Sequence, residues 1–310
     1  MQNKLKNYAY NIYELTKRNM LIFFKNKTTV FFSLIAPILI LVIYILFMGN
    51  LQVNMIKDQF PDLNLTEKEI LSITNAWMIA GIIGIACLTV ALNSMFIAIS
   101  DKERRVIDDF TASPVKLINL TLSYFISAFI LTFLICFIFM TIGSLYLIIT
   151  GGGHYIFSFY EFLQLIGILT LSSLSAVIGL MCITSFFNKT TTAASFTGIF
   201  TALIGFLIGA YLPASVLPKS IQNFANLIPG THSTALFRQI FMNKVLNTQS
   251  ITSKVSPEFI IQIKEQFGFN LSLFGYELNQ AHMIVYLSVS IIIFFILYIV
   301  INKLKAKTKR

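Results

Sequence analysis

Six long apolar stretches constrain this chain more than any other feature of its sequence. None of them contains Asp, Glu, Lys or Arg, and each has about 20 residues or more, the length at which an α-helix crosses a bilayer core. They are residues 28–48, 75–100, 117–150, 162–187, 193–212 and 281–302. With 310 residues, 56% hydrophobic and only 12% charged, the sequence predicts an all-α integral membrane protein with six transmembrane helices. A soluble enzyme, a disordered chain and a disulfide-stapled secreted domain are excluded.

The distribution of basic residues indicates how these helices are oriented. If the spans alternate, sixteen of the 23 Lys and Arg residues fall on the side of both termini, and seven fall in the longer loops opposite. The positive-inside rule then places both termini in the cytoplasm, with residues 303–310 as a tail. The net charge of +10 therefore reflects topology and contact with anionic membrane lipids rather than nucleic-acid binding. Because residues 1–27 are largely polar, the first stretch is expected to stay as a span and not to be cleaved as a signal peptide.

The segment before the first stretch has an apolar helical face. That face consists of Leu5, Tyr8, Ile12, Leu15, Met20 and Phe23, and polar residues lie largely opposite. The pattern predicts an amphipathic helix within residues 1–27 that lies along the inner leaflet. The alternative is a tail that only brings its lysines to the membrane surface.

The loop at residues 101–116 is the most densely charged part of the chain. Its first ten residues, DKERRVIDDF, contain four acids, three bases and three apolar residues, which is too much charge to enter lipid. Ser113 and Pro114 follow, as an N-cap and a first helical residue would. We expect a short charged cytoplasmic helix that turns into the third span. It is either a solvated connector or a docking site for another protein, and the periodicity leaves both open.

The outer loop at residues 213–280 is the longest and is divided by prolines. Between the prolines lie three helix-compatible, partly apolar segments, at residues 219–228, 232–246 and 257–267. The first two are expected to form short, half-buried helices at the outer surface.

Small and polar residues within the spans indicate packing faces and a possible path. Small residues recur in the fifth stretch at a spacing that lets helices approach closely, against the same chain or a second copy: Gly198, Ala202, Gly205 and Gly209. The polar residues Asn75, Asn93, Thr197 and Thr201 are candidates to line a cleft. Asn93 is the strongest of them, because an unpaired amide inside the membrane is costly, although it is also able to bond a neighbouring helix.

Other functional classes lack the residues they need. The spans hold no ionised relay of the kind that proton- or sodium-coupled carriers use. Polyprenyl transferases would need two acid-rich metal sites, but only Asp108-Asp109 is paired, and it lies among bases in a loop. No intramembrane protease motif is present. The three cysteines lie inside apolar stretches without metal-ligand spacing, so no metal site is predicted.

The sequence resembles the permease subunits of type-2 ATP-binding-cassette (ABC) exporters, a family with the type V exporter fold. The segment SDKERRVIDDFTASPVK resembles the family's E-R-G-T-x-E-x-L-x-x-S-P-V coupling helix, with Arg105 and Val106 where Gly-Thr is usual and Asp108-Asp109 where Glu-x is. The segment YLPASVLPKSIQNFANLIPGTHSTALFRQIF resembles its re-entrant helices at the outer leaflet. Residues that fit this second pattern, and are implied to form an extracellular gate, are Pro213, Pro218, Pro229, Thr231 and Arg238.

The resemblance implies a transporter subunit without a catalytic site or bound cofactor of its own. No GxxxxGK[ST] motif occurs, so ATP and magnesium would bind a separate ABC ATPase, present in two copies beside two permease chains. The residues implied to contact the ATPase, by rim ion pairs around a central apolar contact, are Lys102, Glu103, Arg104, Arg105, Val106, Ile107, Asp108, Asp109 and Phe110. The expected cargo is a hydrophobic or amphipathic compound such as a drug, an antimicrobial peptide or a lipid. The alternatives are a lipid-linked glycan of teichoic acid or O-antigen type and, more remotely, a receptor or scaffold. The extra residues 244–280 have no assigned role.

Overall fold

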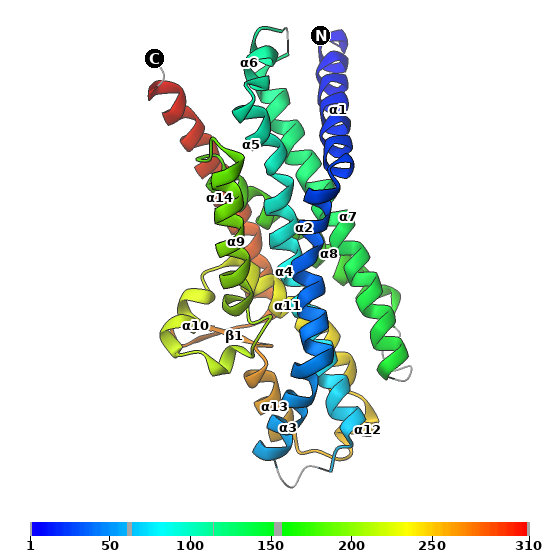
Figure 1. The fold of residues 1–310 in the computed structure, drawn as a ribbon. Coiled ribbons are helices and arrows are strands. Elements are labelled where there is room, and N and C mark those ends of the chain that lie inside the picture. Colours follow the sequence, from blue (N-terminus) through cyan, green and yellow to red (C-terminus); the bar gives the residue numbers. More distant parts are fainter. Residues whose placement is uncertain (1, 61–63, 114, 152–156, 309–310) are drawn as a thin grey trace.

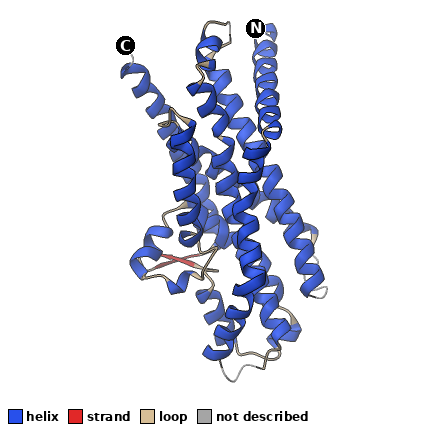
Figure 2. Ribbon diagram, viewed as in Figure 1, coloured by secondary structure: helices blue, strands red, loops and turns tan. Residues whose placement is uncertain are grey.

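The computed structural model describes residues 2–60, 64–113, 115–151 and 157–308, which are helical apart from loops and one short hairpin (Figure 2). Six helices in this part of the chain are long and apolar enough to cross a membrane, so the expected all-α membrane fold is confirmed. They are Lys27–Phe47, Glu67–Glu103, Leu117–Thr150, Phe159–Thr184, Thr190–Leu207 and Gln280–Lys305.

The elements follow one another in chain order as labelled in Figure 1. The first half contains α1 (Gln2–Lys25), α2 (Lys27–Ile43), a π-helical turn (Tyr44–Met48), α3 (Gly49–Gln59), α4 (Glu67–Ser94), α5 (Phe96–Glu103), α6 (Val106–Thr111) and α7 (Leu117–Gly151). The second half contains α8 (Phe159–Thr184), α9 (Thr190–Leu207), a 3-10 turn (Ala214–Val216), α10 (Lys219–Ala225), α11 (Pro229–Leu246), α12 (Gln249–Thr252), α13 (Pro257–Gln266), β1 (Leu271–Leu273), β2 (Tyr276–Leu278) and α14 (Gln280–Thr308).

Capping residues decide where several spans begin and end. The second and fourth helices start before the expected residues 75 and 162, because Thr66 with Glu69 and Ser158 with Glu161 form capping boxes ahead of them. The fifth helix ends before residue 212, since Gly209 has a left-handed backbone with φ of 71°.

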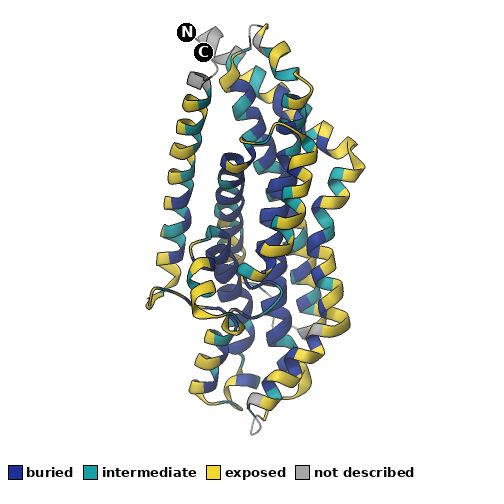
Figure 3. Cartoon of the chain, turned by 60° about the vertical axis from the view of Figure 1, so that its left-hand side comes forward, coloured by how far each residue is buried: buried dark blue, intermediate teal, exposed yellow. Residues whose placement is uncertain are grey.

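Helix α4 is the centre of the molecule. It is buried along most of its length and packs against α2, α7, α8 and α11. Figure 3 shows the buried residues gathered in the interior helices, whereas α14 stands at the edge of the bundle and is largely exposed. This difference separates α4, which contacts protein on all sides, from spans whose outer faces suit lipid.

Helix α11 runs back into the bundle beside α4. A Cβ on Gly230 would lie 2.7 Å from Leu88 of α4, and one on Gly84 of α4 would collide with Thr234. Most residues of α11 are buried, so it is not the half-buried surface helix that the sequence predicts. Its hydroxyls enter this environment because they bond to backbone carbonyls nearby: Thr234 Oγ1 donates to the carbonyl of Gly230 at 2.8 Å within α11, and Thr231 Oγ1 donates to that of Ala225 at 2.6 Å.

A cap of short elements covers the end opposite the termini. There, α3, α12 and α13 lie beyond the spans (Figure 1). Ion pairs lie between the cap and the start of α4, at Lys57 with Glu67, which is exposed, and at Lys254 with Glu69; Lys244 of α11 pairs with Glu161 of α8. The rings of Phe60 and Phe259 meet edge to face at 4.9 Å, and Trp77 meets Phe267 at 5.5 Å. Residues after 244 therefore pack beside α3 and on α4, at the end opposite the termini.

The N-terminal helix α1 forms as expected but differs in orientation. It stands beside α7, roughly along the axis of the bundle (Figure 1), and does not lie flat across the ends of the spans. Leu15 and Phe23 are buried in the core, and Asn19 Nδ2 donates to Ser123 Oγ of α7 at 3.3 Å. These contacts provide the apolar face with a protein partner in place of lipid.

The charged loop forms two helices instead of the single one expected over residues 101–110. Helix α5 continues the direction of the second span as far as Glu103, and the six-residue α6 begins at Val106. Between them Arg105 adopts a left-handed backbone, with φ of 60°, at the position where the resemblance expects glycine. Ser113 does not cap α7, which begins only at Leu117: its hydroxyl donates to the carbonyl of Phe110 and accepts from the Val115 amide. Pro114 lies outside the described residues.

Candidate functional site

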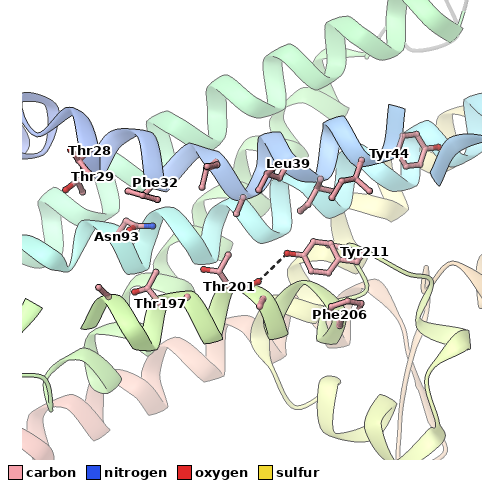
Figure 4. A pocket seen from close by; sticks show the side chains of 18 of the residues that line it. Thr28, Thr29, Phe32, Leu39, Tyr44, Asn93, Thr197, Thr201, Phe206 and Tyr211 are labelled. Atoms are coloured by element: carbon pink, nitrogen blue, oxygen red, sulfur yellow. Dashed lines mark hydrogen bonds between the residues drawn. The ribbon is translucent and has the colours of Figure 1, made fainter. Parts of the chain in front are cut away.

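A cavity of about 890 Å³ lies between α2, the inner part of α4 and α9. Its walls are mostly apolar, with Phe32 and Leu39 on α2 and Phe206 on α9 (Figure 4). A volume of this size is within the range of about 300–1,000 Å³ typical of ligand sites. Because the cavity lies between membrane-spanning helices, its contents would be held at the depth of the bilayer.

Polar groups are few and lie on opposite walls of this cavity. Asn93 is buried at the end of α4, and its Nδ2 donates to the carbonyl of Thr89 at 2.8 Å. Thr197 and Thr201 face it from α9, while Thr28 and Thr29 lie near the start of α2 (Figure 4). Asn93 retains a second N–H and a carbonyl oxygen for a ligand.

Three of the four predicted path residues therefore meet in one cavity. The fourth, Asn75, is buried nearer the start of α4 and does not line it. Composition alone did not indicate the aromatic wall, which includes Tyr44 and Tyr211. Aromatic residues are common throughout these spans, so only helix packing decides which of them line the cavity.

The small residues of the fifth span serve different purposes. No atom lies within 4 Å of a Cβ placed on Gly198, and Ala202 is exposed, so both make a smooth wall of the cavity. Gly205 allows the ring of Tyr211 to pack directly on the helix, and Gly209 ends the helix. The predicted stripe is thus divided between an open face and an internal contact.

Two tyrosines lie at the end of the cavity that is farther from the chain termini. The Tyr211 hydroxyl donates to the carbonyl of Thr201 at 3.3 Å, and its ring meets Phe206 edge to face at 4.8 Å. Tyr44 lies across from them in the π-helical turn that follows α2 (Figure 4). A π-helical turn inside a span is a frequent mark of a functional position.

Arg238 connects several elements next to this end of the cavity. It is buried on α11, its Nη2 donates to the carbonyl of Gly209 at 2.6 Å, and its Nη1 donates to that of Gly268 at 3.4 Å. The guanidinium also lies 5.5 Å from the centre of the Trp77 ring. Carbonyl dipoles and a ring face therefore surround this cation and join α9, α11, α4 and the cap. Of the other predicted gate residues, Pro213 and Thr231 are buried, Pro229 begins α11, and Pro218 is exposed before α10.

The charged segment on the side of the termini contacts the start of α9. Glu103 Oε2 accepts hydrogen bonds from the Thr190 amide at 2.9 Å and the Thr190 hydroxyl at 2.7 Å. A carboxylate at a helix N-terminus is favourable, because it meets free amides and the positive end of the dipole. Lys102 Nζ donates to the carbonyls of Ser185 and Phe187 in the preceding turn. These bonds connect α5 to the start of α9, one wall of the cavity.

The exposed surface of this segment is charged. Arg104, Arg105, Asp108 and Asp109 are exposed on and before α6. The apolar residues that the sequence suggested as a central contact point the other way: Ile107 and Phe110 pack against the core of the chain, and Val106 is half-buried.

Asp101 is a site residue that the sequence analysis did not single out. Its carboxylate is buried and accepts two hydrogen bonds from Arg18 of α1, at 2.7 and 2.9 Å, and one from the Tyr124 hydroxyl of α7, at 2.6 Å. The bond to Asp101 raises the pKa of Arg18. Three helices therefore meet at one charged cluster beside the loop.

Comparison with protein families identifies the class of this chain. Residues 10–242 match the model of the ABC-2 type transporter family, which covers well over half of the 310 residues. The chain belongs to the ABC-2 type transporter family. No curated protein matches its sequence.

Membership in this family indicates which part of a transporter this ABC-2 protein forms. The ABC-2 membrane domain is a transmembrane permease component, not itself catalytic, and such permeases generally work with an ABC ATPase. In the described residues no group of three or more His, Cys, Asp or Glu is placed to hold a metal ion. The match ends at residue 242, so α12 and α13 of the cap and all of α14 lie beyond it.

Proposed function

We propose that this ABC-2 permease exports a hydrophobic or amphipathic compound, such as a drug, a peptide or a lipid, from a bacterial cell. It would work as a dimer of two permease chains, the same or homologous, with two ABC ATPases that bind ATP and magnesium. Both termini would be cytoplasmic. The observation that carries this proposal is the apolar cavity between α2, α4 and α9, which has polar groups only at a few points.

The cavity is open on one side. This supports the proposal that a second permease chain forms the missing wall. Large apolar side chains are exposed in its walls, among them Phe32 and Leu39 on α2 and Phe206 on α9. Lipid is able to cover such residues, but it would also fill an open path for cargo. A second copy that presents the same helices would enclose two cavities in one central path.

The links between α5 and α9 support coupling to an ATPase. In this proposal the ATPases bind the exposed charges at Arg104, Arg105, Asp108 and Asp109, and their closure moves α5 and α6. The bond between Glu103 and Thr190 then carries that movement to α9. Charged rims of this kind favour specificity and fast association.

The proposal is tested by ATP-dependent transport into inverted membrane vesicles that contain the permease and its ATPase. The probes are a fluorescent amphipathic dye and a fluorescent amphipathic peptide. Ala202→Trp, which fills the cavity, is expected to lower the rate at least about tenfold through steric exclusion. Leu203→Trp is the matched control, because the neighbouring residue faces a different cavity, and it should retain most of the rate.

Other outcomes point to other functions. Equal transport by both variants would show that the cargo does not pass this cavity. Accumulation of a lipid-linked glycan in cells that lack the permease, without transport of either probe, would favour glycan export. Absence of any ATP-dependent flux would favour a receptor or scaffold.

A further inference from the structure

A second cavity lies on the other side of α9, away from the cavity that would carry cargo. It has a volume of about 580 Å³ and is enclosed by α8, α9, α14 and the segment that joins α10 to α11. In Figure 1, α9 and α14 stand beside each other at one edge of the bundle. None of the residues that line this cavity lines the first one, so α9 separates two cavities.

Apolar stripes on three helices form the walls of the second cavity. On α9 the lining residues recur three and four positions apart, which places them on one face of the helix. They are Phe196, Ile199, Phe200, Leu203, Ile204 and Leu207. Similar stripes run from Ser172 to Ile183 on α8 and from Leu287 to Leu297 on α14. The cavity therefore extends along the helices instead of crossing between them.

The length of these stripes matches one leaflet of a bilayer. From Phe196 to Leu207 the chain advances eleven residues, which is about 16 Å at about 1.5 Å per residue. The stripe from Ser172 to Ile183 on α8 has the same length. The hydrocarbon core of a bilayer is about 30 Å thick and consists of two leaflets, so the acyl chains of one leaflet extend about 15 Å.

Polar side chains in the walls of the second cavity bond within the chain. Ser175 Oγ shares a hydrogen bond with Ser290 Oγ of α14 at 3.1 Å, and Ser233 Oγ donates to the carbonyl of Gly230 at 3.0 Å. No charged residue is among those that line the cavity. A buried water needs about two to four polar partners, so these walls favour an apolar occupant.

The second cavity opens between α9 and α14. On the closed side, a Cβ on Gly179 of α8 would lie 3.0 Å from the ring of Phe294, so this glycine allows α14 to pack on α8. On the open side, Leu203 of α9 and Leu297 of α14 line the cavity but are 57% and 44% exposed. Exposed leucines within a membrane span meet lipid tails, which are equally apolar. The opening therefore admits acyl chains from the bilayer.

We propose that one acyl chain of a membrane phospholipid occupies the second cavity as a resident ligand. The acyl chain lies along the stripe of α9, with α8 and α14 on its other sides. Unfilled apolar space loses van der Waals contacts, whereas an acyl chain in this cavity gains contacts on three sides. Because no charged residue lines the cavity, the acyl chain is recognised and the headgroup is not. This binding does not depend on the cargo or on transport.

The test uses a phosphatidylcholine with a photoreactive diazirine midway along one acyl chain. The full-length permease is reconstituted with this lipid, exchanged into detergent to remove loosely held lipid, and irradiated. Mass spectrometry then identifies the labelled peptides. Label is expected on the stripes of α8, α9 and α14 that line the second cavity. A phosphatidylglycerol with the same acyl chain should label the same peptides equally.

Tryptophan substitutions in the walls provide matched variants. Leu297→Trp narrows the cavity from α14 and is expected to lower the label at least about fivefold through steric exclusion. Ile296→Trp is the control, because the neighbouring residue is also exposed, at 55%, but does not line the cavity. It should retain the label. Leu203→Trp narrows the cavity from α9 and should act like Leu297→Trp, which shows that the loss is not a local distortion of α14.

Several results would overturn the proposal. These are loss of all label on detergent exchange, full label in Leu297→Trp, or an equal loss in Ile296→Trp. Retention of phosphatidylglycerol but not phosphatidylcholine would show that a headgroup is recognised instead. Displacement of the lipid probe by a transported amphipathic dye would assign the cavity to the cargo path. Cross-linking of Leu203→Cys to a second copy of the chain would show that protein, and not lipid, covers the opening.

Discussion

Asp101 shows how much a single charged residue contributes to the side of the chain ends. Its carboxylate lies where α1, α5 and α7 meet, and only 8% of the side chain is exposed. Arg18 and Tyr124 supply three hydrogen bonds to it. A buried carboxylate is costly unless its bonds are satisfied, so these partners and Asp101 depend on one another.

Asp101→Asn is expected to destabilise the isolated permease by about 1–3 kcal/mol. The amide keeps the size of the side chain but leaves the Arg18 guanidinium without its counter-charge. The measurement is the thermal unfolding midpoint in detergent. Glu67→Gln is the control, because its ion pair with Lys57 is exposed to solvent and should contribute nothing measurable. Equal midpoints for Asp101→Asn and the unchanged protein would show that the cluster does not hold the three helices together.

At the scale of elements, the contact between α4 and α11 depends on close approach. Gly84 leaves no room for a Cβ beside Thr234, and Gly230 leaves little beside Leu88. Small residues at such contacts let two helix backbones approach, which maximises van der Waals contact inside a membrane. The depth to which α11 enters the bundle therefore depends on these glycines.

Gly84→Ala is expected to destabilise the permease by about 1–3 kcal/mol, since the added methyl group pushes α11 from α4. Gly198→Ala is the matched control, because nothing lies within 4 Å of the added atom. That change should be neutral or stabilising by up to about 1 kcal/mol through higher helix propensity. Chemical unfolding in detergent measures both. This account of the packing would be contradicted if Gly84→Ala left the stability unchanged while Gly198→Ala lowered it.

At the scale of the whole molecule, the two ends of the bundle differ in architecture. One end carries both termini and the segments α5 and α6, and the other carries the cap of α3, α12 and α13 (Figure 1). The three native cysteines are all buried, so they are expected to remain unlabelled by polar thiol reagents. New cysteines can therefore report which end faces the outside of the cell.

Ser253→Cys, exposed in the cap, is expected to react with a membrane-impermeant maleimide on intact cells. Asn188→Cys, exposed between α8 and α9 at the other end, should react only after the membrane is permeabilised. This follows because crossing the bilayer is too costly for a charged reagent. Labelling is measured by a mass shift on a gel. The reverse pattern would show that the termini are outside.

Much of the fold could be predicted from the sequence, whereas the burial of α11 and the break in the charged loop could not. Each expected span falls mostly within an observed helix, because hydropathy over about 20 residues is a local property. The burial of α11 was not predictable, since its Ser, Thr, Arg and Gln residues are typical of an exposed helix. The break at Arg105 was also missed, because only packing of α6 against the core demands a left-handed residue there.

The candidate site divides in the same way. Asn93, Thr197 and Thr201 stood out because polar residues are rare in these spans, but which helices face one another was decided by packing. Asp101 meets Arg18 across 83 positions of the chain, and Lys305 meets Ser185 across 120. The sequence by itself determined the number of spans and the ABC-2 family, since both depend on local composition and motifs. Only the tertiary structure decided the cavities and the charged clusters, because these depend on contacts between helices that are distant in the chain.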